Sequence, residues 1–234
     1  NWRYSLRLMY LMGIISLLLI WFDQKETLNK NETSRSKLSD DYKELFLNRN
    51  FWFYVIVMGF SVGSYFSFLT GAPVISAEYF ELAPSVQGYL FAILGLGFLL
   101  GNFLTGRFAM KIGLTRLMLW GCFIALTGPL LQCFIYLNFI FGPLSFFAPM
   151  FLVGLGQGLI VPNAAAGIVS VNPRLAGSAS GLGATIQVTI GGLLAYITGY
   201  IISIFVTPLP LLFILFLTIL VTLFFSYKLH RNIS

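Results

Sequence analysis

The sequence has few charged residues, few cysteines and little histidine. Charged residues make up 9% of the chain, which contains two cysteines and a single histidine, His230. The eight acidic residues all lie outside the long apolar stretches: six fall between Asp23 and Asn50, and the others are Glu78 and Glu81. No nucleophile stands beside a base, and no spacing of cysteine, histidine and carboxylates is typical of a metal site. These absences argue against the common enzyme and metalloprotein classes. We expect no catalytic residues, no metal and no cofactor.

Apolar residues are abundant instead. Hydrophobic side chains make up 58% of the chain and the mean hydropathy is +0.87, so a fold with this surface in water would not stay soluble. Seven apolar stretches approach or exceed the roughly 20 residues that cross a bilayer. They cover residues 4–22, 51–75, 86–106, 113–137, 143–170, 176–205 and 209–227. This pattern predicts an all-α membrane protein, a polytopic bundle of seven transmembrane helices in a lipid bilayer.

The basic residues alternate between successive connections. Along the chain, the connections and their flanks contain six, none, three, none, one, none and two Lys or Arg. Because basic residues gather on the cytoplasmic side of a membrane, the alternation predicts a cytoplasmic C-terminus. The net charge of +6 then reflects these connections and does not indicate binding to nucleic acid.

The first connection differs from the others in length and polarity. It runs over residues 23–50 and holds six basic and six acidic residues, so we expect a solvated cytoplasmic linker with a short surface helix near 39–47. One apolar stretch precedes it and six follow, as at the junction between two six-helix halves of a transporter. The predicted division is 1–22 as the sixth helix of an N-terminal half, 23–50 as the inter-half linker, 51–228 as a C-terminal six-helix transporter domain, and 229–234 as a cytoplasmic tail. The chain opens at Asn1 without an initiator methionine, and we therefore expect further N-terminal helices in the full-length protein.

The second apolar stretch has two different faces. Gly59, Gly63 and Ser67 recur every four residues and predict a ridge of small residues that lets another helix approach. A second set, at i, i+4 and i+7 spacing, falls on the opposite side of the same helix. Its members are Ser61, Tyr65 and Phe68. Aromatic rings and hydroxyls suit the wall of a cavity for apolar cations or neutral drugs. The alternative is that these rings face lipid or a neighbouring helix.

Four side-chain amides lie deep within three of the apolar stretches. They are Gln132, Gln157, Asn163 and Gln187. An unpaired amide costs several kcal/mol in hydrocarbon, so each should face a neighbouring helix, water or a substrate. Pro162 lies beside Asn163 and predicts a helix bend with freed carbonyl groups. We assign Gln157, Asn163 and Gln187 to the substrate cavity, with an interhelical hydrogen bond as the alternative for Gln157 and Asn163. For Gln132 the interhelical bond is favoured.

Several motifs, taken in order, resemble the Major Facilitator Superfamily, in particular its Bcr/CflA group of bacterial drug–proton antiporters. Trp2-Arg3 is similar to the signature ahead of the family's sixth helix, and residues 22–28 (FDQKETL) are similar to the run that ends it. Residues 101–107 (GNFLTGR) resemble the second-half copy of the family's gating motif. Residues 156–164 (GQGLIVPNA) and 176–181 (AGSASG) resemble the tenth helix and the start of the eleventh. The resemblance covers the chain as helices six to twelve of twelve.

The resemblance implies an alternating-access secondary transporter of the bacterial inner membrane. Its substrates would be amphipathic drugs or related small molecules exported in exchange for protons, with the proton-carrying carboxylate in the N-terminal half. It also implies a gating motif made of Gly101, Gly106, Arg107 and Lys111. Positive charge at this helix end could dock onto helix C-terminal carbonyls across the interface between halves. The alternative for Arg107 and Lys111 is anchoring at the membrane surface.

Other functions also fit these residues. One is a transporter of the same fold that carries a metabolite. A basic residue in the cavity would favour an anionic substrate, and this sequence has none at mid-depth. The remaining alternatives are a seven-helix receptor and an inactive fragment of a split gene.

Overall fold

A computed structural model describes residues 2–23, 38–138 and 141–233 of the 234-residue chain. The chain divides into two units, Asn1–Lys37 and Leu38–Ser234. The first unit contains helix α1 (Trp2–Asp23), whose apolar part runs over residues 6–22. The first predicted apolar stretch is therefore helical. Most of the predicted linker, residues 24–37, lies outside the described residues.

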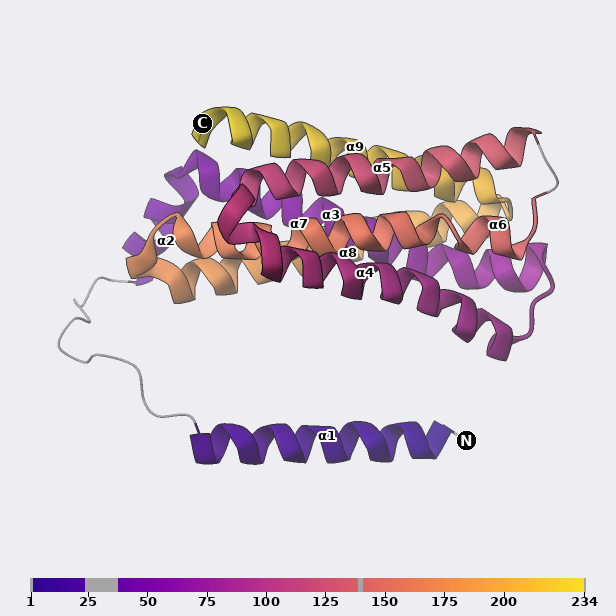
Figure 1. The fold of residues 1–234 in the computed structure, drawn as a ribbon, viewed down its shortest axis with the longest axis horizontal. Helices are drawn as coiled ribbons and strands as arrows, with labels where there is room; N and C mark the ends of the chain where they lie inside the picture. Colours follow the sequence, from indigo (N-terminus) through magenta and orange to yellow (C-terminus); the bar gives the residue numbers. More distant parts are fainter. Residues whose placement is uncertain (1, 24–37, 139–140, 234) are drawn as a thin grey trace. The chain divides into compact units, whose positions relative to one another are not determined.

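The second unit is a bundle of helices, and its described residues contain no strand. In chain order it comprises α2 (Leu38–Leu47), α3 (Arg49–Val74), the π-helical turn η1 (Ile75–Tyr79), α4 (Pro84–Ile112), α5 (Leu114–Asn138), α6 (Pro143–Phe147), α7 (Met150–Ser170), the 3-10 turn η2 (Pro173–Leu175), α8 (Ala176–Ile204) and α9 (Pro208–Ile233). Six described segments are long and apolar enough to cross a membrane: the four built on α4, α5, α8 and α9, and the two in which α3 is extended by η1 and α7 by α6. The long helices run side by side along one axis (Figure 1). These observations confirm the predicted all-α membrane helix bundle.

Local sequence explains where several of these helices begin and end. The side chain of Asn48 caps α3, because its Oδ1 accepts hydrogen bonds from the backbone N–H groups of Asn50 (3.0 Å) and Phe51 (3.3 Å). Proline opens α4, α6 and α9, at positions where a helix needs no backbone donor. Gly113 has a φ of +94° at the end of α4, a conformation that lets the chain reverse into α5 one residue later.

The two ends of the bundle differ in charge. Figure 1 shows α2 and the C-terminus of α9 at the same end. The described Lys and Arg of this unit all belong to α2, to the first turn of α3 and α5, to the last two turns of α4 and α9, or to η2. The alternating directions of the helices bring these segments to that end. Glu78 and Glu81 follow α3 and therefore lie at the opposite end. The basic residues of this unit, which alternate between connections along the sequence, therefore gather at one end of the bundle, away from Glu78 and Glu81.

Close backbone contacts place α7 between α4 and α5. Added Cβ atoms on Gly97 and Gly101 of α4 would lie closer than 3.0 Å to backbone atoms of α7, and those on Gly154 and Gly158 of α7 would equally meet α4. On the other side of α7, a Cβ on Gly156 would meet the backbone of Gly121 in α5. Paired glycines four residues apart let membrane helices approach at the backbone. Gly97, Gly101, Gly154, Gly156 and Gly158 therefore serve helix packing.

The predicted small-residue ridge of α3 is confirmed as a packing surface. Added Cβ atoms on Gly59 and Gly63 would lie closer than 3.0 Å to the side chains of Ile190 and Leu194, both in α8. Ser67 is fully buried as well. The ridge therefore receives the apolar side chains of α8.

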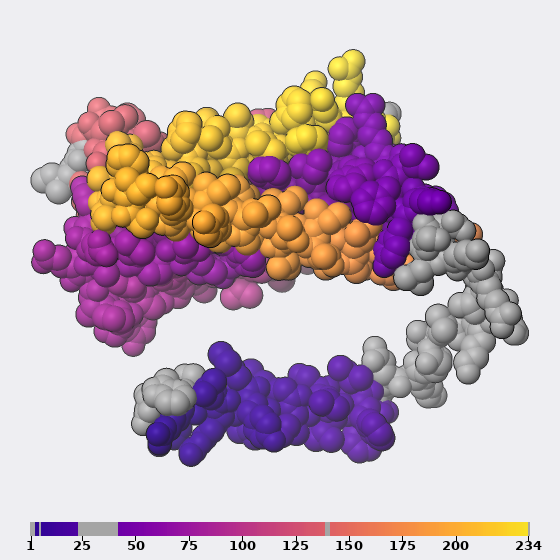
Figure 2. Space-filling view, turned by 180° about the vertical axis from the view of Figure 1, so that it is seen from behind, coloured from indigo at the N-terminus to yellow at the C-terminus, as the bar shows by residue number. Residues whose placement is uncertain are grey.

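Exposure is concentrated on two of the six membrane-length segments. Within an apolar stretch of 18 residues in each segment, the buried share is 22% in α4 and 17% in the α8 segment. In the other four segments the buried share is 39–61%. In the space-filling view, α8 (orange) crosses one face of the unit uncovered by the other helices of that unit (Figure 2). The bundle therefore has one face, carried by α4 and α8, on which little of the helix surface is packed.

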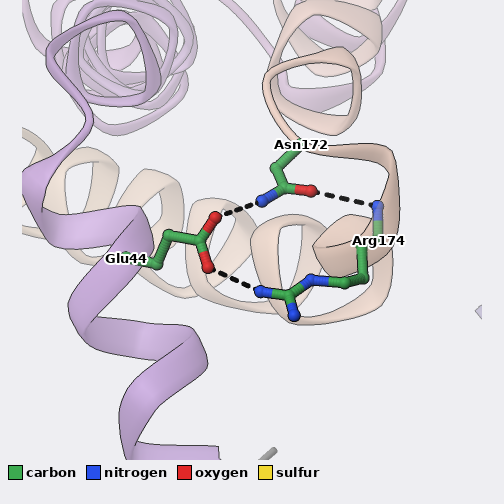
Figure 3. A network of polar contacts seen from close by, with 3 residues as sticks. All are labelled: Glu44, Asn172 and Arg174. Carbon is green, nitrogen blue, oxygen red and sulfur yellow. Dashed lines mark hydrogen bonds and ion pairs between the residues drawn. The ribbon is translucent and has the colours of Figure 1, made fainter. Parts of the chain in front are cut away.

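The short helix α2 confirms the predicted surface helix near 39–47, and it packs on the bundle. Leu45 is 1% exposed and lies in the same apolar cluster as Leu175 and Ala179. The two carboxylate oxygens of Glu44 accept hydrogen bonds from Asn172 Nδ2 and Arg174 Nη2, each at 2.6 Å (Figure 3). The second part of the predicted linker is thus held against the connection between α7 and α8.

Some predicted boundaries differ from the structure. The fifth apolar stretch, 143–170, is interrupted at residues 148–149 between α6 and α7, where Pro149 has no N–H to continue the helix. Gln132 Nε2 of α5 donates a hydrogen bond to the carbonyl of Phe146 beside this interruption, which confirms an interhelical role for Gln132. Helix α9 extends as far as Ile233, through most of the predicted tail of 229–234, and its Leu229 is fully buried against the bundle. The cytoplasmic location of these residues stays a prediction.

Candidate substrate site

A hollow of about 350 Å³ lies among α3, α4, α7 and α8. Its walls are aromatic and aliphatic side chains with two amides, and none of the described residues that line it is charged. They are Val62, Tyr65 and Phe66 from α3, Leu94, Gly95 and Phe98 from α4, Gln157 and Val161 from α7, and Gln187 from α8. Gly95 and Phe98 belong to the exposed surface of α4, so the hollow opens on the sparsely packed face.

Gln157 is the most firmly held polar group of this hollow. Its Nε2 donates to the carbonyl of Ser61 at 3.1 Å and to Ser64 Oγ at 2.7 Å, and Ser64 Oγ itself donates to the Ser61 carbonyl at 2.7 Å. These bonds join α7 to α3 and use the donors of the amide. No described residue donates a hydrogen bond to Gln157 Oε1, so this oxygen keeps its capacity to accept one.

Tyr65 and Gln187 also line the hollow, from α3 and α8, and each is half-buried. Ser61 contributes through its backbone carbonyl, since its side chain is 2% exposed and its Oγ has no partner among the described residues. Four of the six predicted cavity residues are therefore grouped around the hollow, either lining it or holding Gln157.

The other two predicted cavity residues are placed elsewhere. Phe68 is fully buried, and its ring lies 5.4–5.8 Å from the rings of Phe91, Phe146 and Phe147. It thus stabilises an aromatic cluster that joins α3 to α4 and α6, and the structure corrects its predicted position on the cavity wall. Asn163 is 1% exposed and lies outside the lining, with its Nδ2 donating to Leu159 O at 2.7 Å and to Thr105 Oγ1 at 3.3 Å. The alternative role of Asn163, an interhelical hydrogen bond, is the one that the structure contains.

Pro162 accounts for the hydrogen bonds around Asn163. A proline inside a helix has no N–H for the carbonyl four residues earlier, which here belongs to Gly158. Thr105 Oγ1 of α4 donates to that carbonyl at 2.9 Å. The freed carbonyl therefore has its partner in the neighbouring helix, and α7 remains helical through Pro162. A bend at this position stays a prediction.

The predicted gating residues separate into two groups. Gly101 is buried against the backbone of α7. Gly106, Arg107 and Lys111 are exposed, and a Cβ on Gly106 would meet no described atom within 4 Å. Gly101 therefore serves packing inside this unit, whereas the other three are available to a surface outside it.

Sequence reasoning missed several residues of the hollow. Ser64 lies one helical turn from Ser61, and this spacing could have identified it as a polar partner for an amide. Phe66 and Phe98 had no comparable signal, because they are two of 24 phenylalanines in the chain. Their positions depend on which helices meet, which the spacing of apolar residues does not reveal.

Comparison with known proteins identifies the family. The sequence model of the Major Facilitator Superfamily matches residues 1–196. An "Uncharacterized MFS-type transporter YdgK" of Bacillus subtilis is 27% identical over 206 residues, covering 85% of this chain and 50% of that protein. A "Bicyclomycin resistance protein homolog" of Haemophilus influenzae is 23% identical over 198 residues, covering 83% of this chain and 49% of that protein. No solved structure gave a significant match.

The chain therefore spans about half the length of the curated relatives it matches. Family membership favours the transporter class over an enzyme or a seven-helix receptor. Its helices agree with this class, since six described segments could each cross a bilayer. This multi-pass membrane protein belongs to the Major Facilitator Superfamily.

Proposed function

We propose that this chain forms part of a proton-coupled exporter of amphipathic drugs or related small molecules. The observation that carries the proposal is the hollow between α3, α4, α7 and α8. It offers the Tyr65, Phe66 and Phe98 rings, an unpaired Gln157 oxygen and the half-buried Gln187. Aromatic rings attract cations and apolar surfaces alike, and a single acceptor orients a ligand without demanding a charge. Neutral or cationic amphipathic molecules therefore fit this lining better than anionic metabolites.

The relatives support the same substrate class. One of them is named for resistance to bicyclomycin, a property of that protein. We extend drug export to this chain on the combined strength of that relationship and the uncharged lining. The proposal also includes proton coupling, a bacterial inner-membrane location and a cytoplasmic C-terminus. The basic end of the bundle supports the cytoplasmic C-terminus.

We further propose that the face carried by α4 and α8 packs against a second six-helix half supplied by the full-length protein. This face is the least packed part of the bundle and the hollow opens on it, so the second half would close the opposite wall. The exposed Gly106, Arg107 and Lys111 would contact that half as a gating motif. An immunoblot of the source membranes tests this arrangement, with a product near twice 26.1 kDa expected and one near 26.1 kDa contradicting it.

The substrate proposal is tested by resistance and efflux assays on the full-length protein. Tyr65→Ala should change resistance to some compounds of a panel and leave others unchanged, because compounds differ in how much they use one aromatic wall. Phe213→Ala is the matched control, since Phe213 is a 62% exposed ring on α9 outside the hollow. Equal losses for all compounds at Tyr65, or the same pattern at Phe213, would refute the substrate assignment. Efflux that is unaffected by a protonophore would refute proton coupling alone.

A further inference from the structure

A second apolar hollow, of about 730 Å³, lies between α5 and α9. Leu119 and Phe123 line it from α5, and Leu220, Phe224 and Tyr227 line it from α9. None of its lining residues belongs to the hollow described above, and α5 and α9 contribute nothing to that site. We call it the α5–α9 groove. Phe123, Phe224 and Tyr227 are all more than half exposed, so the groove is open along the side of the bundle.

The groove ends among basic residues at the α2 end of the bundle. His230 lines it directly and lies 3.0 Å through Nδ1 from Thr115 Oγ1, which ties the end of α9 to the start of α5. The Lys228 ammonium lies 4.5 Å from the centre of the Phe224 ring, in the groove wall. A cation over an aromatic face stays near that face while its charge remains accessible to an anion.

Helical spacing adds two further positive charges at the same end. Arg116 stands one turn before Leu119 and two turns before Phe123 on α5, and Arg231 stands one turn after Tyr227 on α9. Both arginines are exposed. The ion pair between described residues joins Arg174 to Glu44. No described carboxylate therefore forms an ion pair with Arg116, Lys228 or Arg231.

We propose that the α5–α9 groove binds an anionic phospholipid, with an acyl chain along the apolar walls and the phosphate at Arg116, Lys228 and Arg231. An apolar slot on a membrane-facing surface suits an acyl chain. A cluster of Lys and Arg at the level where a membrane helix ends attracts anionic head groups. The long basic side chains can extend to the head-group layer while their methylene groups cover the groove. The complementary charge distinguishes an anionic lipid from a zwitterionic one with the same chains.

Photoactivatable lipids test the proposal on the full-length protein. The protein is reconstituted into phosphatidylcholine vesicles containing a trace of a photoactivatable phosphatidylglycerol or of the phosphatidylcholine with identical chains. Cross-links are mapped by mass spectrometry to the peptides of α5 and α9. Labelling of these peptides by the phosphatidylglycerol should exceed labelling by the phosphatidylcholine severalfold. Each basic residue near a membrane surface contributes about a fivefold preference for anionic lipid, so the double variant Lys228→Gln, Arg231→Gln should remove most of the difference.

Two further variants separate a specific site from general attraction. Lys43→Gln removes an exposed charge of the same end on α2 and should leave the preference intact. Val221→Trp fills the groove from α9 and should lower labelling by both lipids while the basic residues remain. Labelling by the phosphatidylcholine in the Lys228/Arg231 double variant reports whether the groove persists after the charges are removed.

The contrary outcomes are equally definite. Equal labelling by the two lipids, or an equal loss of preference in Lys43→Gln, would refute recognition of the head group at this groove. Unchanged labelling in Val221→Trp would refute the acyl-chain site. Absence of labelling by either lipid would mean that protein covers the groove, either a second copy of the chain or another of its segments, and would overturn the proposal.

Discussion

Thr105 Oγ1 donates a hydrogen bond of 2.9 Å to the carbonyl oxygen of Gly158, the group that Pro162 leaves without a helical donor. This bond joins α4, which carries Arg107 and Lys111 of the predicted gating motif, to α7, which carries Gln157. The hydroxyl also accepts from Asn163 Nδ2 at 3.3 Å, so one threonine and one amide together complete the hydrogen bonds around the proline. The backbone hydrogen bond that Pro162 removes from α7, beside the candidate substrate site, is in this way replaced by one from the neighbouring helix.

Thr105→Val should therefore destabilise the bundle although the side chain keeps its shape. We expect the unfolding free energy to fall by about 1 kcal/mol, the usual size of an interhelical hydrogen bond in membranes. Titration of the purified protein with a denaturing detergent measures this change. Thr105→Ser keeps the hydroxyl and should retain more of the stability, and a Val variant as stable as the parent would contradict the assigned role.

Gly97→Ala should disturb the packing of α4 on α7. A Cβ at this position would lie closer than 3.0 Å to the backbone of Phe151, and backbone cannot move aside as a flexible side chain can. We expect a loss of about 1–3 kcal/mol, typical of overpacking. Gly88→Ala on the same helix is the control, because no described atom lies within 4 Å of its added Cβ. Equal stabilities of the two variants would contradict the close approach.

Arg107→Ala should reduce export of every substrate alike. Arg107 is exposed at the end of α4 and far from the lining of the hollow, so its loss should affect the conformational cycle and not the fit of one compound. Efflux measured across the compound panel, normalised to the amount of protein in the membrane, tests this. Lys43→Ala removes a comparable exposed charge from α2 as a control. A loss confined to some compounds would instead place Arg107 in substrate recognition.

The attachment of α2 should depend more on Leu45 than on the ion pair of Glu44. Exposed ion pairs contribute about 0–1 kcal/mol, and the side chains of Glu44 and Arg174 are 50% and 58% exposed. Leu45 is 1% exposed, and truncating a buried leucine costs about 2–5 kcal/mol. Limited proteolysis near α2 should therefore accelerate strongly in Leu45→Ala and weakly in Glu44→Gln. The reverse order would show that the polar contacts hold this helix.

Much of the architecture could be predicted from particular sequence features. The spacing of Gly59 and Gly63 predicted a packing ridge, and α8 occupies it. The mixed charges of residues 23–50 predicted a surface helix near 39–47, which is α2. The interruption at Pro149 was not predicted, because the residues around it are apolar and proline alone does not distinguish a tolerated kink from a break.

The site was predicted less completely than the fold. Tyr65 and Phe68 lie three residues apart on α3 and were expected to share one face, yet Tyr65 lines the hollow and Phe68 is enclosed by other rings. The amides divide similarly, since Gln157 reaches the hollow while Asn163 bonds within α7 and to α4. Both distinctions depend on neighbours from other helices, such as Phe91 and Thr105.

The sequence by itself determined that this protein crosses a membrane as a bundle of helices, and that the basic side chains of residues 38–233 gather at one end of that bundle. The sequence is sufficient for this because a segment that crosses the hydrocarbon must satisfy its own backbone hydrogen bonds and needs about 20 apolar residues. Only the tertiary structure decided which faces of those helices form the hollow, the α5–α9 groove and the interior. Lipid tails are as apolar as a protein interior, so the pattern of apolar residues along a membrane helix does not distinguish a buried side from a lipid-facing one. That distinction comes from the close contacts between glycines and the few polar groups that meet across helices.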